Sequence, residues 1–227
     1  SKSSIFLKWL FFKTGIGASN QFETLGFLKT DKNQTYPNLQ YHFLPLAIKY
    51  DGSAPFRGHG FQFHIGTMRS KSRGFIEIID KNPLSSPTIQ FNYLKHSDDM
   101  KDFRNAIKIS RKILSQQSFS MFLDKEINPG AEIKTNAQLD AYIRSNVESA
   151  YHPCGTCKMG DEADIETVVT PDCKVKGTEN LYCADSSIFP SITNGNLNAP
   201  SIMIGEKAAD HILNKPTLPK DNSVPFL

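Results

Sequence analysis

The sequence contains no long hydrophobic run. Its longest apolar stretch, "IFLKWLFF" at residues 5–12, is interrupted by Lys8 and is shorter than the roughly 20 apolar residues that a membrane-spanning helix needs. We therefore predict no membrane-spanning helix. The first residues share some features with a signal peptide, but no initiator Met precedes them and no small-residue cleavage site follows cleanly. We expect an excised fragment that begins inside a domain.

The chain is also poor in net charge and in cysteine. Its formal net charge is +3 and its lysines are scattered, so we expect no nucleic-acid partner. Four cysteines in 227 residues do not require disulfides, and a reducing cytoplasm is the default setting. The remaining composition, 39% hydrophobic and 22% charged residues, is typical of a globular protein with a sizeable core.

A complete glycine-rich phosphate-binding loop is missing as well. Such a loop needs three spaced glycines between a strand and a helix, with an acidic residue further on. The pairs Gly15 with Gly17 and Gly58 with Gly60 lack the third glycine and the following helix. We therefore expect the pyrophosphate site of any dinucleotide cofactor to lie outside this chain.

The first half of the chain has the pattern of antiparallel strands. Between about residues 11 and 93, short apolar stretches alternate with Gly, Pro, Asn and Asp. Period-two alternation in "FQFHI" and "GFIEI" favours strands with one buried face. Two helices are predicted to follow, one at 98–119 behind an N-cap at Ser97 and one from Asn136 to Val147 behind Thr135.

The last third adds one more strand and one more helix. We predict a short apolar strand within "ENLYCADSSIFP" and a helix from near Pro200 to about Leu213, with the proline in a first turn where it is tolerated. The Pro-rich tail at 215–227 is expected to be poorly ordered. The fold class is therefore α+β, with an antiparallel or mixed sheet flanked by helices.

The segment "HPCGTCKMG", which begins at His152, allows several kinds of chemistry. Cys154 and Cys157, together with Cys173 and Cys183, resemble the ligands of a zinc site in which His152 could replace one thiolate. Only the first pair has the right spacing. A redox dithiol needs its CxxC at a helix N-terminus, whereas a glycine and acidic residues follow here. Both remain open as alternatives, but we expect no metal and interpret the cysteines as reduced packing residues.

His152 stands in a distinctive backbone frame. Pro153 fixes one backbone torsion and Gly155 permits conformations that other residues avoid, so the pair can hold one imidazole rigidly. An imidazole titrates near neutral pH, which suits a general base. A satisfied loop histidine is the alternative interpretation.

The segment "NGNLNAP" places three asparagines, Asn194, Asn196 and Asn198, just before the last predicted helix. The first N–H groups of a helix are unpaired and its N-terminus is positive, which favours an anion or an electron-rich ring edge. The alternative is simple helix capping by Asn198. Asp185, upstream, could bind a ribityl or ribose hydroxyl or could cap the turn that follows it.

Together, these motifs resemble the C-terminal signature of the glucose-methanol-choline (GMC) flavin oxidoreductases. "AYHPCGTCKMG" and "ENLYCADSSIFPSITNGNLNAPSIMIGEKAADHIL" match that signature in order and spacing. "TGIGASNQFE", "PNLQYHFLPLAIKY" and "HGFQFHIGTMRSKSRGFIEI" look most like the choline-oxidising bacterial members of the family. The resemblance extends over about residues 9–213.

The resemblance implies a division of the chain. Residues 1–150 would form the substrate-binding domain, and residues 151–214 would supply the last strand and helix of a truncated FAD-binding domain. Residues 215–227 would form the tail. The N-terminal FAD-binding half, with its glycine-rich loop, would be the partner of this segment within the same protein, and the fragment alone is expected to be inactive.

The resemblance also implies roles for individual residues. His152 would accept the substrate hydroxyl proton, Asn196 would hydrogen-bond the substrate oxygen, and Tyr151 would place an aromatic face near a trimethylammonium group. The expected FAD contacts are Ala184, Asp185, Asn196, Asn198, Ala199 and Pro200. A helix N-terminus near Asn198 would stabilise the negative charge of reduced flavin.

The implied activity is oxidation of choline to betaine aldehyde, a step of glycine betaine biosynthesis and osmoprotection, by hydride transfer to flavin N5. Another primary alcohol is the nearer alternative substrate, and a zinc or CxxC module is the distant alternative function. The resemblance leaves the electron acceptor open between oxygen and a quinone, and it identifies no carboxylate partner for the ammonium group. We expect the parent protein in the bacterial cytoplasm, with peripheral association with the inner membrane left open.

Overall fold

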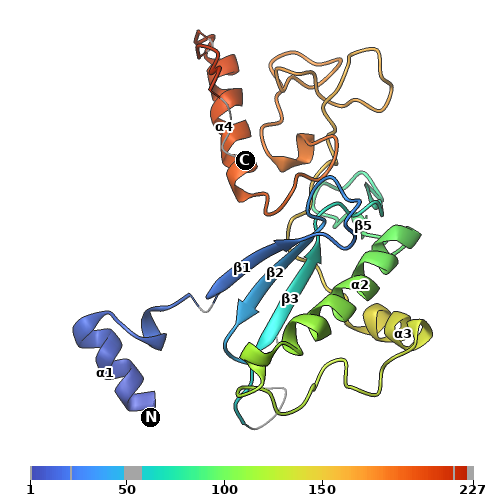
Figure 1. The fold of residues 1–227 in the computed structure, drawn as a ribbon. Helices are drawn as coiled ribbons and strands as arrows, with labels where there is room; N and C mark the ends of the chain where they lie inside the picture. The colour runs from blue at the N-terminus through green and yellow to red at the C-terminus, as the bar shows by residue number, and fades with distance from the viewer. Residues whose placement is uncertain (1, 21, 49–57, 217, 224–227) are drawn as a thin grey trace. The chain divides into compact units, whose positions relative to one another are not determined.

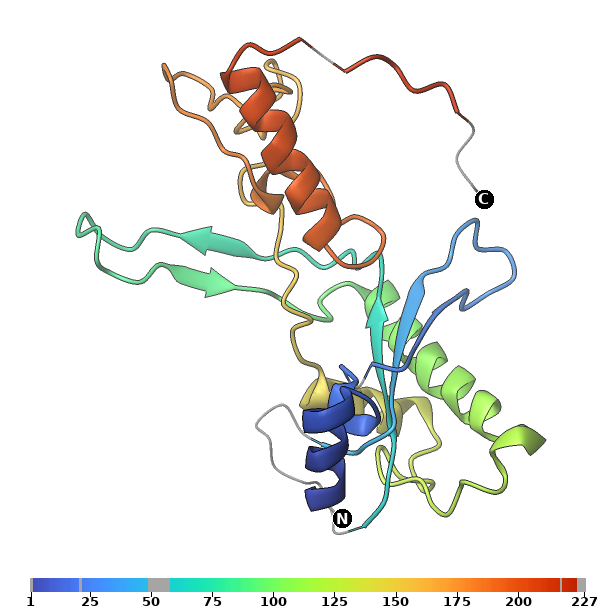
Figure 2. The same cartoon turned by 90° about the vertical axis from the view of Figure 1, so that its left-hand side faces the viewer.

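A computed structural model of the chain describes residues 2–20, 22–48, 58–216 and 218–223. The chain divides into two compact units, one formed by Ser1–Gly74 with Gln90–Ala150 and the other by Phe75–Ile89 with Tyr151–Leu227 (Figures 1 and 2). The predicted α+β class is confirmed, because four α-helices and small antiparallel strand pairings occur in the described part of the chain. The assignment of the two predicted domains to substrate and flavin binding stays a prediction.

The first unit contains a three-stranded antiparallel sheet in the order β1 (Thr24–Leu28), β2 (Leu39–Leu44) and β3 (Gln62–Thr67). These strands confirm the predicted antiparallel pattern, and "FQFHI" lies largely in β3. Leu39 and Tyr41 point to the same face because strand side chains alternate, and both are buried there. Part of the predicted strand region, residues 49–57, lies outside the described residues.

Helix α2 (Ser97–Leu114) covers this face of the sheet. The Tyr41 hydroxyl donates to the carbonyl oxygen of Ala106 at 2.9 Å, and burial raises the pKa of that hydroxyl. The predicted N-cap at Ser97 is wrong, because the cap is His96, whose Nδ1 accepts from the Asp98 backbone N–H at 3.2 Å. An imidazole nitrogen is as able to accept this bond as a hydroxyl, so the helix begins at Ser97 itself.

The predicted helix is also shorter than expected at its C-terminal end, since residues 117–119 form a separate 3₁₀ turn, η2 (Gln117–Phe119). Helix α3 (Asn136–Asn146) confirms the second predicted helix and its cap. Thr135 and Gln138 form a capping box, which satisfies donors at the helix start. Helices α2 and α3 pack through a buried cluster composed of Leu94, Met100, Leu139 and Ile143.

The N-terminal apolar stretch forms helix α1 (Lys2–Phe12), followed by a 3₁₀ turn, η1 (Ile16–Ala18), neither of which we predicted. Apolar residues lie on most sides of α1, so its sequence shows little helical period. Gly17 lies close to α1, because an added Cβ would lie 3.1 Å from Trp9 Cβ, which is a tight contact. In the described part of the chain, every helix is too short or too polar to cross a membrane.

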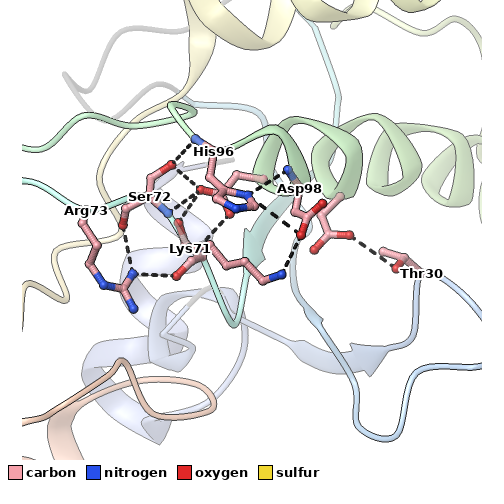
Figure 3. Close-up of polar contacts among 9 residues, drawn as sticks. Thr30, Lys71, Ser72, Arg73, His96 and Asp98 are labelled. Atoms are coloured by element: carbon pink, nitrogen blue, oxygen red, sulfur yellow. Dashed lines mark hydrogen bonds and ion pairs between the residues drawn. The ribbon is translucent and has the colours of Figure 1, made fainter.

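A buried carboxylate ties the loop after β3 to the start of α2. Asp99 is 3% exposed and accepts hydrogen bonds from Ser70 Oγ at 2.7 Å, Lys71 N at 2.9 Å and Ser72 N at 3.0 Å. The His96 backbone N–H donates to Ser72 Oγ at 3.0 Å, which closes this Asp99 clamp (Figure 3). Burial works to raise the pKa of Asp99, but the hydrogen bonds from Ser72, Ser70 and two backbone amides outweigh it and hold the pKa below its ordinary value.

The second unit contains the two-stranded β4 (Phe75–Glu77) and β5 (Thr88–Gln90), a 3₁₀ turn η3 (Ser186–Ile188) and helix α4 (Asn198–Ile212). Its core is composed of Val169, Cys173, Ile188, Phe189, Leu197 and Ala208. Helix α4 confirms the predicted final helix, with Pro200 in its first turn. Of the tail predicted at 215–227, residues 217 and 224–227 lie outside the described residues.

The strand predicted within residues 179–190 is wrong. Only Tyr182 makes a β-bridge there, to Lys174, and η3 follows. An apolar run becomes a strand when a neighbouring strand pairs with its backbone over several residues, and here the pairing is limited to this bridge and the hydrogen bonds beside it.

Candidate active site

The structure brings together two predicted site residues that are 44 positions apart in the sequence. Asn196 Nδ2 lies 2.8 Å from His152 Nε2. An amide nitrogen can only donate, so Nε2 accepts this bond and the ring proton resides on Nδ1. In this tautomer the imidazole presents a lone pair on the side where Asn196 lies, which is the state that a general base needs.

The loop that carries His152, residues 152–160, is fastened to η3 by a row of backbone hydrogen bonds. Gly155 N–H donates to Ser186 O at 3.3 Å, Cys157 N–H to Ser187 O at 2.9 Å and Met159 N–H to Ile188 O at 2.8 Å. Gly155 has φ +86°, a left-handed conformation that other residues rarely adopt. The predicted need for glycine here is therefore confirmed, and the His152 loop has a defined backbone path.

Tyr151, immediately before the loop, also has a left-handed backbone, with φ 58°. This conformation is uncommon for a bulky residue, and such positions concentrate at functional sites. The Tyr151 side chain is exposed and lies beside His152 at the edge of a cavity. An aromatic face at this position is accessible to a ligand.

The cavity has a volume of about 320 Å³, a size suited to a small organic molecule. Its lining is composed of Tyr151, His152, Pro153, Ser186, Leu197, Asn198 and Ser201. Leu197 lies within the stretch from Asn196 to Pro200 that was expected to contact flavin, whereas Ser186 and Ser201 were not predicted. Spacing could have indicated Ser201, because it follows Leu197 by one helical turn and its hydroxyl donates to the Leu197 carbonyl oxygen at 2.6 Å.

The cavity adjoins the N-terminus of α4. The N-cap residue is Leu197, which makes no side-chain capping bond, and Asn198 is the first helical residue. The alternative that Asn198 caps the helix is therefore wrong. Leu197 supplies no side-chain cap to the first-turn N–H groups, and the positive end of the helix favours an electron-rich group beside them.

The other predicted flavin contacts have different surroundings. Asp185 caps η3, because its Oδ1 accepts from Ser187 N at 2.8 Å, and the hydrogen bonds from Ser187 lower the pKa of this carboxyl. Capping was one of its two predicted roles. Ala184 and Ala199 are exposed and Pro200 is half-buried, and all of them lie outside the cavity lining as described.

The cysteines contribute mainly to packing. Cys173 is 2% exposed within the core, and Cys154 and Cys183 pack against that core, which confirms the predicted packing role of Cys154. Within residues 2–20, 22–48, 58–216 and 218–223, no three His, Cys, Asp or Glu residues are grouped so as to hold a metal ion.

Comparison with known proteins identifies relatives over the whole chain. The family model described as GMC oxidoreductase matches residues 70–205. The chain is 52% identical over its full length to a protein from Brucella ovis named oxygen-dependent choline dehydrogenase, and 51% identical over 220 residues to one of the same name from Rhizobium rhizogenes. It spans 41% and 40% of the length of these relatives.

Solved structures show the same fold. Pyridoxine 4-oxidase from Mesorbium loti superposes with a TM-score of 0.77 at 26% identity, covering 87% of this chain and 39% of that enzyme. Formate oxidase superposes with a TM-score of 0.83 at 20% identity, covering 94% of this chain and 41% of that enzyme, which supports the fold alone. The matched family model and the relatives in sequence together show that the chain belongs to the GMC oxidoreductase family.

Proposed function

We propose that this chain is the C-terminal part of an FAD-dependent oxidoreductase that oxidises choline to betaine aldehyde. One observation carries the proposal: the Asn196 amide lies 2.8 Å from a His152 Nε2 lone pair at the edge of a cavity. The 52% identity to a protein named oxygen-dependent choline dehydrogenase supports the choice of substrate.

The two side chains divide the work on the substrate hydroxyl. An alcohol oxygen that replaces the direct Asn196–His152 bond accepts a hydrogen bond from the Asn196 amide and donates its proton to His152 Nε2. An alcohol carbon releases hydride readily only as its hydroxyl loses this proton, so proton acceptance by His152 accelerates the reaction. Asn196 stabilises the negative charge that develops on the oxygen.

The residues beside the cavity fit a flavin. GMC family members are FAD-dependent, and bound FAD would supply the hydride acceptor. The α4 N-terminus, where Leu197 makes no side-chain capping bond, offers partial positive charge to an electron-rich ring edge, with Asn198 and Ser201 as polar neighbours in the cavity lining. A complete glycine-rich loop is missing from this sequence, so we assign the remaining FAD contacts to a separate FAD-binding half of the same protein.

The proposed partner is an FAD-binding half of the same protein. The chain spans 41% of the Brucella relative, and large apolar side chains are exposed on it. Phe11 of α1 is 70% exposed, Ile78 beside β4 is 84% exposed and Ile202 of α4 is 59% exposed. Exposed apolar surface of this extent favours coverage by another part of the protein.

Replacing the proposed base tests the reaction. We expect His152→Ala in the complete flavoprotein to lower choline turnover by about 100-fold or more, because a positioned general base contributes at least that much. His211→Ala, at the far end of α4 from the cavity, is the matched control and should retain activity. Turnover by His152→Ala equal to that of the control would exclude His152 as the base.

Substrate choice is tested at Tyr151. A quaternary ammonium has no N–H to donate, so recognition by an aromatic face is worth about 0.5 to 2 kcal/mol, or roughly 2- to 30-fold in preference. We expect Tyr151→Ala to lose this preference for choline over an uncharged alcohol of similar size, whereas Tyr151→Phe should keep it. If the unmodified enzyme prefers the uncharged alcohol, the activity is that of a GMC oxidoreductase with another primary alcohol as substrate.

A further inference from the structure

The structure pairs the cysteines differently from their order in the CxxC motif. Cys154 packs against the core of the second unit, whereas Cys157, three residues later, lies outside that cluster and is half-buried. Cys157 and Cys183, which are distant in sequence, both contact Ser187, and Cys157 is close enough to influence the thiol of Cys183. The contact that matters for thiol chemistry is therefore between Cys157 and Cys183, and the motif spacing does not predict it.

Ser187 holds both members of this pair. The Cys157 backbone N–H donates to the Ser187 carbonyl oxygen at 2.9 Å, and Cys183 Sγ lies 3.0 Å from Ser187 Oγ. Ser187 belongs to η3, the turn to which the His152 loop is fastened. Ser187 therefore binds the backbone of Cys157 and the thiol of Cys183, which makes the two cysteines neighbours.

A rival pairing is available to Cys183. Its backbone N–H donates to the Cys173 carbonyl oxygen at 2.9 Å, so these two residues are also neighbours. Cys173, however, is 2% exposed, whereas Cys157 is partly exposed. An oxidant dissolved in water therefore reaches Cys157 in preference to Cys173.

We propose that Cys157 and Cys183 form a peroxide-sensitive thiol pair that closes to a disulfide and links the His152 loop to the segment just before η3. In the first step, Cys157 sulfur attacks hydrogen peroxide, the O–O bond breaks, and sulfenic acid and water are formed. In the second step, Cys183 sulfur attacks the sulfenic sulfur, the S–O bond breaks, and a second water leaves. Two thiols are oxidised and one peroxide is reduced, so atoms and electrons balance.

The surroundings of Cys183 assign the order of the steps. Burial raises the pKa of the Cys183 thiol, and the neighbouring Cys157 and Asp185 act in the same direction. This raised pKa disfavours Cys183 as the thiol that attacks peroxide, so the first step is assigned to Cys157. Because only the thiolate attacks, we expect closure of the disulfide to become faster as the pH rises.

Peptide mapping tests the pairing without requiring the proposed function. The reduced chain is treated with hydrogen peroxide, its remaining thiols are blocked with N-ethylmaleimide, and trypsin is added without a reductant. Cys154 and Cys157 lie in the tryptic peptide 145–158, whereas Cys183 lies in 177–207. We expect these two peptides to be recovered joined, with fragment spectra placing the link at Cys157.

Two variants identify the reacting thiol. Cys157→Ser should lose the joined peptides, and Cys154→Ser should keep them. The same treatment in concentrated guanidinium should give a mixture of links, which shows that native joining depends on the fold. The proposal is overturned by a link within peptide 145–158, by a link between 177–207 and the Cys173 peptide 159–174, or by four blocked thiols after peroxide treatment of the native chain.

Discussion

At the scale of single residues, backbone conformation decides which positions accept substitution. Tyr151 immediately precedes His152 and Gly155 follows it by three residues, and both have left-handed backbones. Glycine adopts this conformation at no steric cost, whereas Tyr151 adopts it although its Cβ is disfavoured there. The backbone around His152 is therefore determined from both sides.

Gly155→Ala should destabilise the chain by about 1 to 2 kcal/mol, because φ +86° is strained for alanine and the new Cβ would lie 3.2 Å from the Phe189 carbonyl oxygen. Urea unfolding measures the change. Gly205→Ala on α4 is the control, since an added Cβ there meets no atom within 4 Å and alanine favours a helix by about 1 kcal/mol over glycine. Equal effects at the two glycines would contradict the strain argument.

At the scale of elements, α2 begins with two neighbouring aspartates in different surroundings. Asp98 is exposed and pairs with Lys71 Nζ at 2.6 Å, whereas Asp99 is buried in its clamp. Hydrogen bonds hold the pKa of Asp99 below its ordinary value. The folded state therefore gains stability from ionised Asp99 above the ordinary carboxyl pKa, and it loses this stability as the pH falls through the lower folded value.

Asp99→Asn should lower the free energy of unfolding at neutral pH by about 2 kcal/mol, because the amide cannot accept all the bonds that the carboxylate accepts. The difference from the unmodified chain should shrink as the pH falls through the folded pKa of Asp99. Urea unfolding at a series of pH values checks both statements. Asp98→Asn, one position away, should lower the free energy of unfolding by less, and added salt should reduce this change further. A loss of stability as large as that of Asp99→Asn would contradict the proposed role of the Asp99 clamp.

At the scale of the whole molecule, each unit has its own buried cluster. Leu139 and Ile143 anchor one cluster of the first unit, and Val169 and Ile188 belong to the core of the second. The hydrogen bonds of the Asp99 clamp lie within the first unit, and those that fasten the His152 loop to η3 lie within the second. Perturbations in the two units should therefore be independent.

The double variant Asp99→Asn, Gly155→Ala tests this independence. Its destabilisation should equal the sum of the two single effects within about 0.5 kcal/mol, as expected for sites that belong to independent units. A double-variant cycle measured by urea unfolding gives the coupling energy. A coupling well above that limit would mean that the clamp and the loop belong to one cooperative network.

The sequence by itself predicted features that depend on neighbouring residues. The cap at Thr135, the proline in the first turn of α4 and the glycine at position 155 follow from local backbone requirements. The order of motifs was enough to indicate the family. The N-cap of α2 was predicted wrongly, because the imidazole nitrogen of His96 caps the helix in place of the Ser97 hydroxyl. The strand near Tyr182 was predicted wrongly, because a strand forms only where a neighbouring strand pairs with it, and Tyr182 makes a single bridge.

The tertiary structure alone decided which distant residues meet. Asn196 contacts His152, Cys157 and Cys183 both bind Ser187, and Asp99 binds the loop after β3. Local propensities carry no information about these contacts, because they arise when separate segments pack against a common core. The sequence by itself therefore determined the family, the helices α2 to α4 and the residue types of the site, and folding determined which of those residues can act together.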